Sequence, residues 1–445
     1  MTMANETKRR SQFLVTEDWW AVYLGLGIVL VALIFFSFGG TIKALAVSPP
    51  KWESFNQVTE HFKAHIYWYL LQLIVWVIIF SVSTSIMGFK IKKYVPGFII
   101  IFIASALILI AGQWKVAHDN NLEPPILALI VGLIIGNLFN MPKWFESALR
   151  TEYYIKTGIV LLGATLPFTL IVYAGPIAFI QATIVSLTTF LIIFFAGTKL
   201  FGLEKPFASV LGAGGAVCGV SGSIAIGAAT RAKKEHISIG ICVVALWAIV
   251  MIFFLTFFIK SVGMNEGIAG AWIGTSEFAD AAGFAAAASV GGDAAIHAYT
   301  LMKVIGRDIW IGIWAFFLSV ISVVYWEKKS SDPADRAGVS VVWARFPKFV
   351  LGFFLASVIM SIASSIVGEE TYDSSLKPLV VTPIKTLRTW TFIFTFLSIG
   401  LTTRFKEIFQ FGWKPLVVFT IGVIINVPLG YFLSNVVFRS YWISL

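Results

Sequence analysis

The stretch Leu211-Gly-Ala-Gly-Gly-Ala-Val-Cys-Gly-Val-Ser-Gly-Ser223 holds five glycines and two serines in thirteen residues, inside an apolar run from Phe207 to Thr230. In a bilayer an unsatisfied backbone amide is costly, so glycine-broken backbone is tolerated only where protein buries it or where it lines a wet cavity. We therefore predict an interrupted helix over residues 207–230 that forms part of a binding site. The alternative is that the glycines let a neighbouring helix approach closely.

The composition is that of a polytopic membrane protein. The 445 residues are 58% hydrophobic and 13% charged, with a mean hydropathy of +0.87, whereas a soluble domain is about a quarter charged. The net charge of +10 comes from lysines and arginines in short loops, where they set orientation and do not indicate nucleic-acid binding. Cys218 and Cys242 lie in apolar segments, so neither a disulfide framework nor a metal site is expected. No cofactor motif or nucleotide-binding loop occurs.

A membrane helix needs about 20 apolar residues, and this length predicts an all-α protein with about 11–13 membrane segments. The predicted parts are a cytoplasmic tail (1–18), N-terminal transmembrane helices (19–123), a first repeat (124–260) and a second repeat (268–440). A second interrupted helix is expected at residues 268–290, where small residues dominate and acidic residues intervene. A tight hairpin is predicted at Ala174-Gly175.

The two repeats are predicted to be inverted. Leu162-Gly-Ala-Thr-Leu-Pro-Phe168 aligns with Ile399-Gly-Leu-Thr-Thr-Arg-Phe405, and each is the Gly-x-Thr end of a helix. If both interrupted helices re-enter, the basic clusters at 8–10, 90–93, 231–234, 328–329 and 404–406 all become cytoplasmic. If they cross, the 231–234 cluster becomes external, which the positive-inside rule disfavours. Both geometries stay open. We expect a multi-pass protein of the bacterial inner membrane with a cytoplasmic N-terminus.

Three motifs carry a family resemblance. Gly212-Ala-Gly-Gly-Ala-Val-Cys-Gly-Val-Ser221, Gly158-Ile-Val-Leu-Leu-Gly163 and Ile399-Gly-Leu-Thr-Thr-Arg404 resemble the YeiH-type family, whose members are provisionally labelled sulfate exporters. The likeness runs from about Pro125 to the C-terminus. It implies a fold similar to the sodium/bile-acid symporter and cation/proton antiporter group, with inverted repeats, a panel and a core. A homodimer is implied by fold analogy alone.

The first break predicts a site for an oxyanion. The N-terminus of a half-helix offers unpaired amides and the positive end of the helix dipole, as in discontinuous transporter helices that meet anionic substrates. The candidates are Cys218, Gly219, Ser221, Gly222 and Ser223. A cation could instead use the carbonyls released at the same break, and the serines could simply bond back to the helix.

Further polar residues are candidates for the same cavity. Thr275 and Ser276 precede the acids of the second element, and Thr165 and Thr402 end the two Gly-x-Thr helices. The alternative for such hydroxyls is a bond to their own helix. Lys303 lies inside an apolar span and is predicted to pair with the anion or with Asp280, unless it snorkels to the interface.

Acidic residues of the second element are candidates for a coupling proton or sodium ion, because intramembrane acids are expensive and mark functional sites. Asp280, flanked by alanines, is the first choice and Glu277 the second, with a solvated mouth as the alternative for Glu277. Arg307 is predicted to form a structural clamp with Asp293 or Asp308.

These residues favour a secondary active transporter of a small inorganic or organosulfur anion, sulfate-like or sulfonate-like, that works by alternating access. Uptake and export are not distinguished. The alternative is a cation/proton exchanger that uses Asp280. A more remote alternative is an intramembrane enzyme with Cys218 or Ser221 as nucleophile and His236 or His297 as base, although no Gly-x-Ser-x-Gly or His-Glu-x-x-His motif occurs. We thus expect no enzyme, and as partners a small anion, a coupling proton or sodium, and the lipid bilayer.

Overall fold

The computed structural model describes residues 15–119, 124–165, 168–326, 347–368, 371–404 and 412–445. Within these ranges the chain is helical, and β-structure is limited to a single bridge between Trp52 and Trp114. Most of the predicted cytoplasmic tail (1–14) and the basic residues at 8–10, 328–329 and 406 lie outside the described residues. The chain divides into two compact units: unit 1 comprises Met1–Leu170 and Lys348–Arg404, and unit 2 comprises Ile171–Pro347 and Phe405–Leu445.

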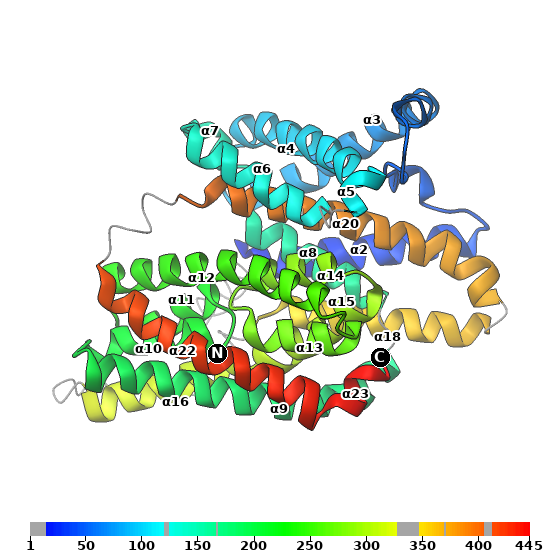
Figure 1. The fold of residues 1–445 in the computed structure, drawn as a ribbon. Helices are drawn as coiled ribbons and strands as arrows, with labels where there is room; N and C mark the ends of the chain where they lie inside the picture. Colours follow the sequence, from blue (N-terminus) through cyan, green and yellow to red (C-terminus); the bar gives the residue numbers. More distant parts are fainter. Residues whose placement is uncertain (1–14, 120–123, 166–167, 327–346, 369–370, 405–411) are drawn as a thin grey trace, which may run out of the picture. The chain divides into compact units, whose positions relative to one another are not determined.

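Unit 1 is built from the N-terminal helices and from the later segment Lys348–Arg404, which is yellow to orange in Figure 1. Its elements are α2 (Glu17–Ser37), η1 (Lys43–Leu45), α3 (Phe55–Ile86), α4 (Ile91–Gly112), α5 (Lys115–Asp119), α6 (Pro124–Leu138), α7 (Lys143–Glu146), α8 (Thr151–Gly163), α18 (Phe349–Val367), η6 (Tyr372–Val381) and α20 (Thr382–Thr402). Helix α8 is central, since it packs against α2, α18 and α20.

Helices α6 and α20 pack with their backbones in near contact. A Cβ atom at Gly132 would lie 2.7 Å from the carbonyl oxygen of Leu397, and one at Gly136 would lie 2.8 Å from that of Gly400. Small residues four apart on one stripe permit such approach in membrane bundles. Here glycine serves helix packing.

Unit 2 begins within α9 (Phe168–Phe195) and holds both segments predicted to be interrupted. Its other elements are η2 (Ala196–Leu200), α10 (Lys205–Ala216), α11 (Val220–Ala229), α12 (Lys234–Ser261), α13 (Glu266–Ser276), α14 (Asp280–Val290), α15 (Asp293–Thr300), η3 (Leu301–Arg307), α16 (Trp310–Ile321), η4 (Ser322–Trp326), α22 (Trp413–Phe432), η7 (Leu433–Val437) and α23 (Arg439–Ile443). In Figure 1 most of them are green to yellow-green, and α22 and α23 are red.

The predicted hairpin at Ala174-Gly175 is wrong. Helix α9 runs without interruption from Phe168 to Phe195 and carries Pro176 in its interior. Glycine and proline are tolerated in membrane helices because neighbouring groups satisfy the freed backbone. A Gly-Pro pair therefore does not end a helix there as it would in water.

Among the described residues, seven helices are long and apolar enough to cross a membrane. They are Glu17–Ser37, Phe55–Ile86, Ile91–Gly112, Gly175–Leu200, Glu235–Ser261, Phe349–Val367 and Trp413–Val437. The prediction of an all-α polytopic membrane protein is confirmed.

Each compact unit draws on both predicted repeats. Unit 1 contains the two Gly-x-Thr helices, α8 and α20, while unit 2 contains both interrupted helices. Under the predicted repeat boundaries, each unit therefore combines segments that lie far apart in sequence. The inverted relation of the repeats stays a prediction.

Candidate functional site

The first interrupted helix ends at Ala216 and resumes at Val220, as α10 and α11. The turn depends on Gly219, whose φ of 65° is a left-handed value that residues with a side chain rarely adopt. A Cβ atom there would also lie 2.6 Å from the carbonyl oxygen of Phe278. The missing side chain thus allows both the turn and a contact with the second break.

The second interrupted helix ends at Ser276 and resumes at Asp280, as α13 and α14. In the break, the Ala279 amide donates a 2.6 Å hydrogen bond to Oε2 of Glu277. Glu277 is fully buried, so the alternative of a solvated mouth is wrong for this residue. Both predicted interruptions are confirmed, and unit 2 brings them together.

Lys303 joins the two breaks. Its Nζ donates to the carbonyl oxygen of Val217 at 2.8 Å and to those of Glu277 and Phe278 at 3.1 and 3.4 Å. The same nitrogen lies 3.6 Å from Oδ1 of Asp280. Lys303 is fully buried in the π-helical segment η3 and therefore does not snorkel. Of the alternatives predicted for Lys303, the structure contains the pair with the Asp280 carboxylate.

Arg307 binds the carboxyl ends of α10 and α13, the half-helices that precede the two breaks. Its guanidinium donates to the carbonyl oxygens of Gly215 (2.8 Å), Ala216 (3.2 Å), Gly274 (3.1 Å), Thr275 (2.8 Å) and Glu277 (3.0 Å). The clamp predicted with Asp293 or Asp308 thus takes a different form. The last four carbonyls of a helix lack partners within the helix, and a guanidinium presents five donors.

These contacts offset the free-energy cost of burying two cations. A charge removed from water costs a great deal unless it is fully hydrogen-bonded or paired. The carboxyl ends of α10 and α13 are the negative ends of their helix dipoles, and Lys303 and Arg307 both bind at these ends. The same contacts hold the two breaks against each other.

We call the place where the two breaks meet the junction. Its accessible backbone lies at the amino ends of α11 and α14, the half-helices that follow the breaks. Val220 and Ser221 begin α11, and Ala279 and Asp280 lie at the start of α14; all four are partly exposed. The preceding residues, from Val217 to Gly219 and from Ser276 to Phe278, are buried. The first residues of α11 and α14 are thus partly exposed, whereas the carbonyl ends of α10 and α13 are buried against the two cations.

Several predicted site residues point elsewhere within unit 2. Ser223 is fully buried and donates to the carbonyl oxygen of Val210 in α10, at 3.2 Å. Gly222 packs toward the carbonyl of Ala213. Thr275 and Ser276 are fully buried, and their hydroxyl oxygens would lie within 2.5 Å of a Cβ atom at Gly430 of α22. These residues support the junction by packing, which leaves Ser221 as the accessible hydroxyl of the set.

Thr165 and Thr402 belong to unit 1. Thr165 donates to the carbonyl of Leu162 at 2.9 Å and accepts a 3.0 Å hydrogen bond from Arg388. Thr402 donates to the carbonyl of Ser398 at 2.8 Å. Both hydroxyls bond back to their own helix, which was the alternative interpretation.

Among the described residues, one group of three side chains has the ligand types that could bind a metal ion. Ligand atoms of Cys218, Asp280 and Asp308 lie within 4.8 Å of one another. The Lys303 ammonium, 3.6 Å from Asp280, already supplies positive charge at this place, so an added cation would meet Coulomb repulsion in a medium of low dielectric constant. The cluster is better suited to balance Lys303 and Arg307 than to hold a metal.

Sequence reasoning missed one residue of the junction. The Tyr299 hydroxyl donates to the carbonyl oxygen of Asp280 at 2.8 Å, and a Cβ atom at Gly283 would lie 2.4 Å from the Tyr299 ring. Tyr299 thereby orients the first turn of α14. A tyrosine inside an apolar segment gives no sequence signal for this role.

Comparison with known proteins gives consistent matches. The family described as "Conserved hypothetical protein 698" matches residues 96–419. A UPF0324 membrane protein of Nitrosomonas europaea is 30% identical over 469 aligned positions, which cover 94% of each chain. UPF0324 membrane proteins of Nitratidesulfovibrio vulgaris and Rhodopirellula baltica are each 33% identical over 82% and 81% of this chain.

The chain spans only 63% and 66% of the length of those last two relatives. No solved structure matches the chain. The family match covers all the helices that form the junction, and the YeiH-type resemblance predicted from the glycine-rich motif is confirmed. The protein is a multi-pass membrane protein that belongs to the UPF0324 family.

Proposed function

We propose that this protein is a secondary active transporter of a small oxyanion of the sulfate or sulfonate class, working by alternating access. One observation carries the proposal: the carbonyl ends of the broken helices are bound by Lys303 and Arg307, whereas the amide ends at Ser221 and Asp280 are partly exposed. The first amides of a helix lack internal partners, and together with the dipole they attract anions.

The same contacts argue against a sodium site at the carbonyls. A sodium ion would need the released carbonyl oxygens, but those of Val217 and Thr275 already accept hydrogen bonds of 2.8 Å from buried cations. Apart from the Asp280 carboxylate, which lies beside Lys303, the groups left for a ligand are donors: backbone amides and the Ser221 hydroxyl. This polarity favours an anion.

Asp280 is the proposed coupling residue. Its carboxylate lies 3.6 Å from Nζ of Lys303 and is 10% exposed, so a proton can reach it. When Asp280 takes up a proton, Lys303 loses its counter-charge and the junction becomes more positive. Anion binding and proton binding then favour each other, since such coupling is reciprocal. Proton–anion symport follows, and Glu277 is a second buried carboxyl beside this pair.

The proposal is tested by thermal unfolding of the purified protein with sulfate, sulfite, thiosulfate and taurine. A ligand that binds only the folded state raises its stability by mass action. We expect one of these anions to raise the unfolding temperature of the wild type, and Ser221→Ala to lose most of that shift. Ser223→Ala is the matched control, because its hydroxyl already binds Val210 inside the protein. Equal shifts in both variants, or none in the wild type, would contradict the proposed site.

A cation/proton exchanger is the second candidate, favoured by the pairing of Asp280 with Lys303. A cation could displace Lys303 from this carboxylate. This function predicts that stability responds to sodium or pH alone and that Asp280→Asn removes the response. Under the anion proposal, Asp280→Asn keeps the anion shift and abolishes its dependence on pH.

We further propose a bacterial inner-membrane location with a cytoplasmic N-terminus, and a homodimeric assembly. The proposal contains no catalytic step. Cys218 is 3% exposed and packs against Phe190, Ile226 and Trp314, which leaves its thiol little room to meet a substrate.

A further inference from the structure

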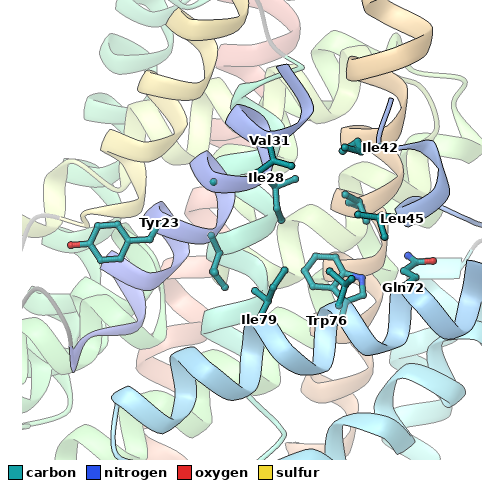
Figure 2. A pocket seen from close by; sticks show the side chains of 12 residues that line it. Tyr23, Ile28, Val31, Ile42, Leu45, Gln72, Trp76 and Ile79 are labelled. Atoms are coloured by element: carbon teal, nitrogen blue, oxygen red, sulfur yellow. The ribbon is translucent and has the colours of Figure 1, made fainter. Parts of the chain in front are cut away.

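An apolar cavity of about 260 Å³ lies within unit 1, between α2 and α3. Figure 2 shows Ile28 and Val31 of α2 on one side and Trp76 and Ile79 of α3 on the other. Both helices are long and apolar enough to span the bilayer. Val31 is 45% exposed, so the cavity opens toward the surface on which lipid chains lie.

Gly27 keeps this cavity open. No heavy atom lies within 4 Å of the place that its Cβ would occupy, whereas a Cβ at Gly25 would lie 2.4 Å from Val160 of α8. The two glycines therefore have different roles: Gly25 lets α2 pack on α8, and Gly27 leaves room beside α3. That room is unfilled by protein.

A polar cavity of about 570 Å³ lies next along the same elements. It is lined by Lys43 and Ser48, by His61 and His65 of α3, and by Thr386 of α20. No carboxylate occurs among the described residues that line it. His65 donates through Nδ1 to the carbonyl oxygen of His61 at 2.9 Å, so the orientation of its ring is fixed.

The two cavities follow one another on three elements. Ile42 and Leu45 line the apolar one, and Lys43 between them lines the polar one. On α3 the apolar lining includes Trp76 and the polar lining includes His65, roughly 16 Å apart along the axis at 1.5 Å per residue. An apolar slot beside a cavity lined by Lys43 and hydroxyl side chains matches a molecule with an acyl chain and a phosphate.

We propose that this pair of cavities holds one phospholipid of the surrounding bilayer, with an acyl chain between α2 and α3 and its phosphate beside Lys43. The site is independent of the proposed transport function, since it is built only from unit 1. It would fix the spacing of α2, which packs on α8, and α3, which packs on η1.

The test is native mass spectrometry of the full chain in detergent, titrated with dioleoylphosphatidylglycerol or with diolein, which lacks the phosphate. We expect one tightly held phospholipid per chain. Gly27→Phe fills the slot and should weaken the binding of both lipids at least about tenfold, because the acyl chain loses the apolar surface that it would bury there. Leu30→Phe is the matched control, because Leu30 lies exposed on α2 outside both cavities.

A second pair of variants tests the phosphate contact. Lys43→Gln should weaken the phospholipid about three- to tenfold and leave diolein unchanged, as expected for a partly exposed charge pair. Lys63→Gln, an exposed lysine of α3 that binds Glu60, should change neither. Equal binding by Gly27→Phe and Leu30→Phe, equal binding by the two lysine variants, or preference for detergent over phospholipid would overturn the proposal. If Gly27→Phe fails to fold, the lysine pair still decides, because Lys43 is exposed.

Discussion

Glycine brings backbones together in both units, but with opposite consequences for the helix. At the contact of α6 and α20 in unit 1, Gly132, Gly136 and Gly400 lie within the two helices, so the close approach leaves both helices unbroken. At the junction in unit 2, Gly219 leaves the helical conformation, and the freed carbonyls of α10 and α13 bind Lys303 and Arg307. A glycine contact becomes a binding site only when the backbone is released.

The largest effect is expected from the cation that binds the released carbonyls. Arg307→Met leaves five carbonyls without their charged donor, and we expect the free energy of unfolding to fall by about 4 kcal/mol or more. Arg404→Met is the matched change in unit 1, where one hydrogen bond to Phe139 is lost, with a cost of about 1 kcal/mol. Denaturant titration in detergent measures both. Similar losses would remove the distinction between the two regions.

The next effect separates a released glycine from a packed one. Gly219→Ala forces a side chain into a left-handed turn and against Phe278, at about 2–3 kcal/mol. Gly132→Ala meets the Leu397 carbonyl at 2.7 Å and should cost about 1–3 kcal/mol.

The anion-induced thermal shift distinguishes the two glycine variants further. Gly219→Ala should also abolish the anion-induced thermal shift, because it displaces the first turn of α11, whereas Gly132→Ala should preserve the shift. An anion response lost in both variants would place the site outside the junction.

A smaller effect is expected at the start of α14. Glu277→Ala removes the acceptor of the Ala279 amide, and a lost helix cap costs about 0.5–2 kcal/mol. Glu277→Gln keeps an oxygen at this position and should recover most of the loss in unfolding free energy. If Gln is as harmful as Ala, the charge of Glu277 matters more than its hydrogen bond.

The smallest effect concerns an exposed pair that contrasts with buried Lys303. Lys233 donates a 2.6 Å hydrogen bond to Glu204, and this bond holds the pKa of Glu204 below its ordinary value of 4.5. A lowered folded pKa stabilises the protein above pH 4.5, and the contribution is lost as the pH falls through the folded value. Titration of ¹³C-labelled glutamate by NMR should show the pKa of Glu204 rising in Lys233→Gln and unchanged in Lys63→Gln. An unchanged pKa in Lys233→Gln would contradict the contribution of this bond.

Much of the architecture could be predicted from local sequence. Apolar runs of about 20 residues define membrane helices because bilayer thickness fixes their length, and the glycines around Gly219 define a break because glycine alone adopts that backbone conformation freely. The acidic interruption at Glu277 marked the second break for a similar local reason. The hairpin at Ala174-Gly175 failed, since local turn chemistry does not tell whether neighbours will satisfy a freed backbone group.

The chain by itself determined where helices cross and where they break, because hydropathy and backbone freedom are properties of short segments. Which groups bind one another was decided only by the tertiary structure. Arg307 binds carbonyls from residues about 30 and 90 positions away along the chain, and no spacing rule relates such positions. It also turned Ser223 inward and left Ser221 accessible. A helix fixes which face each serine shares, but which face is buried depends on the element that packs against it.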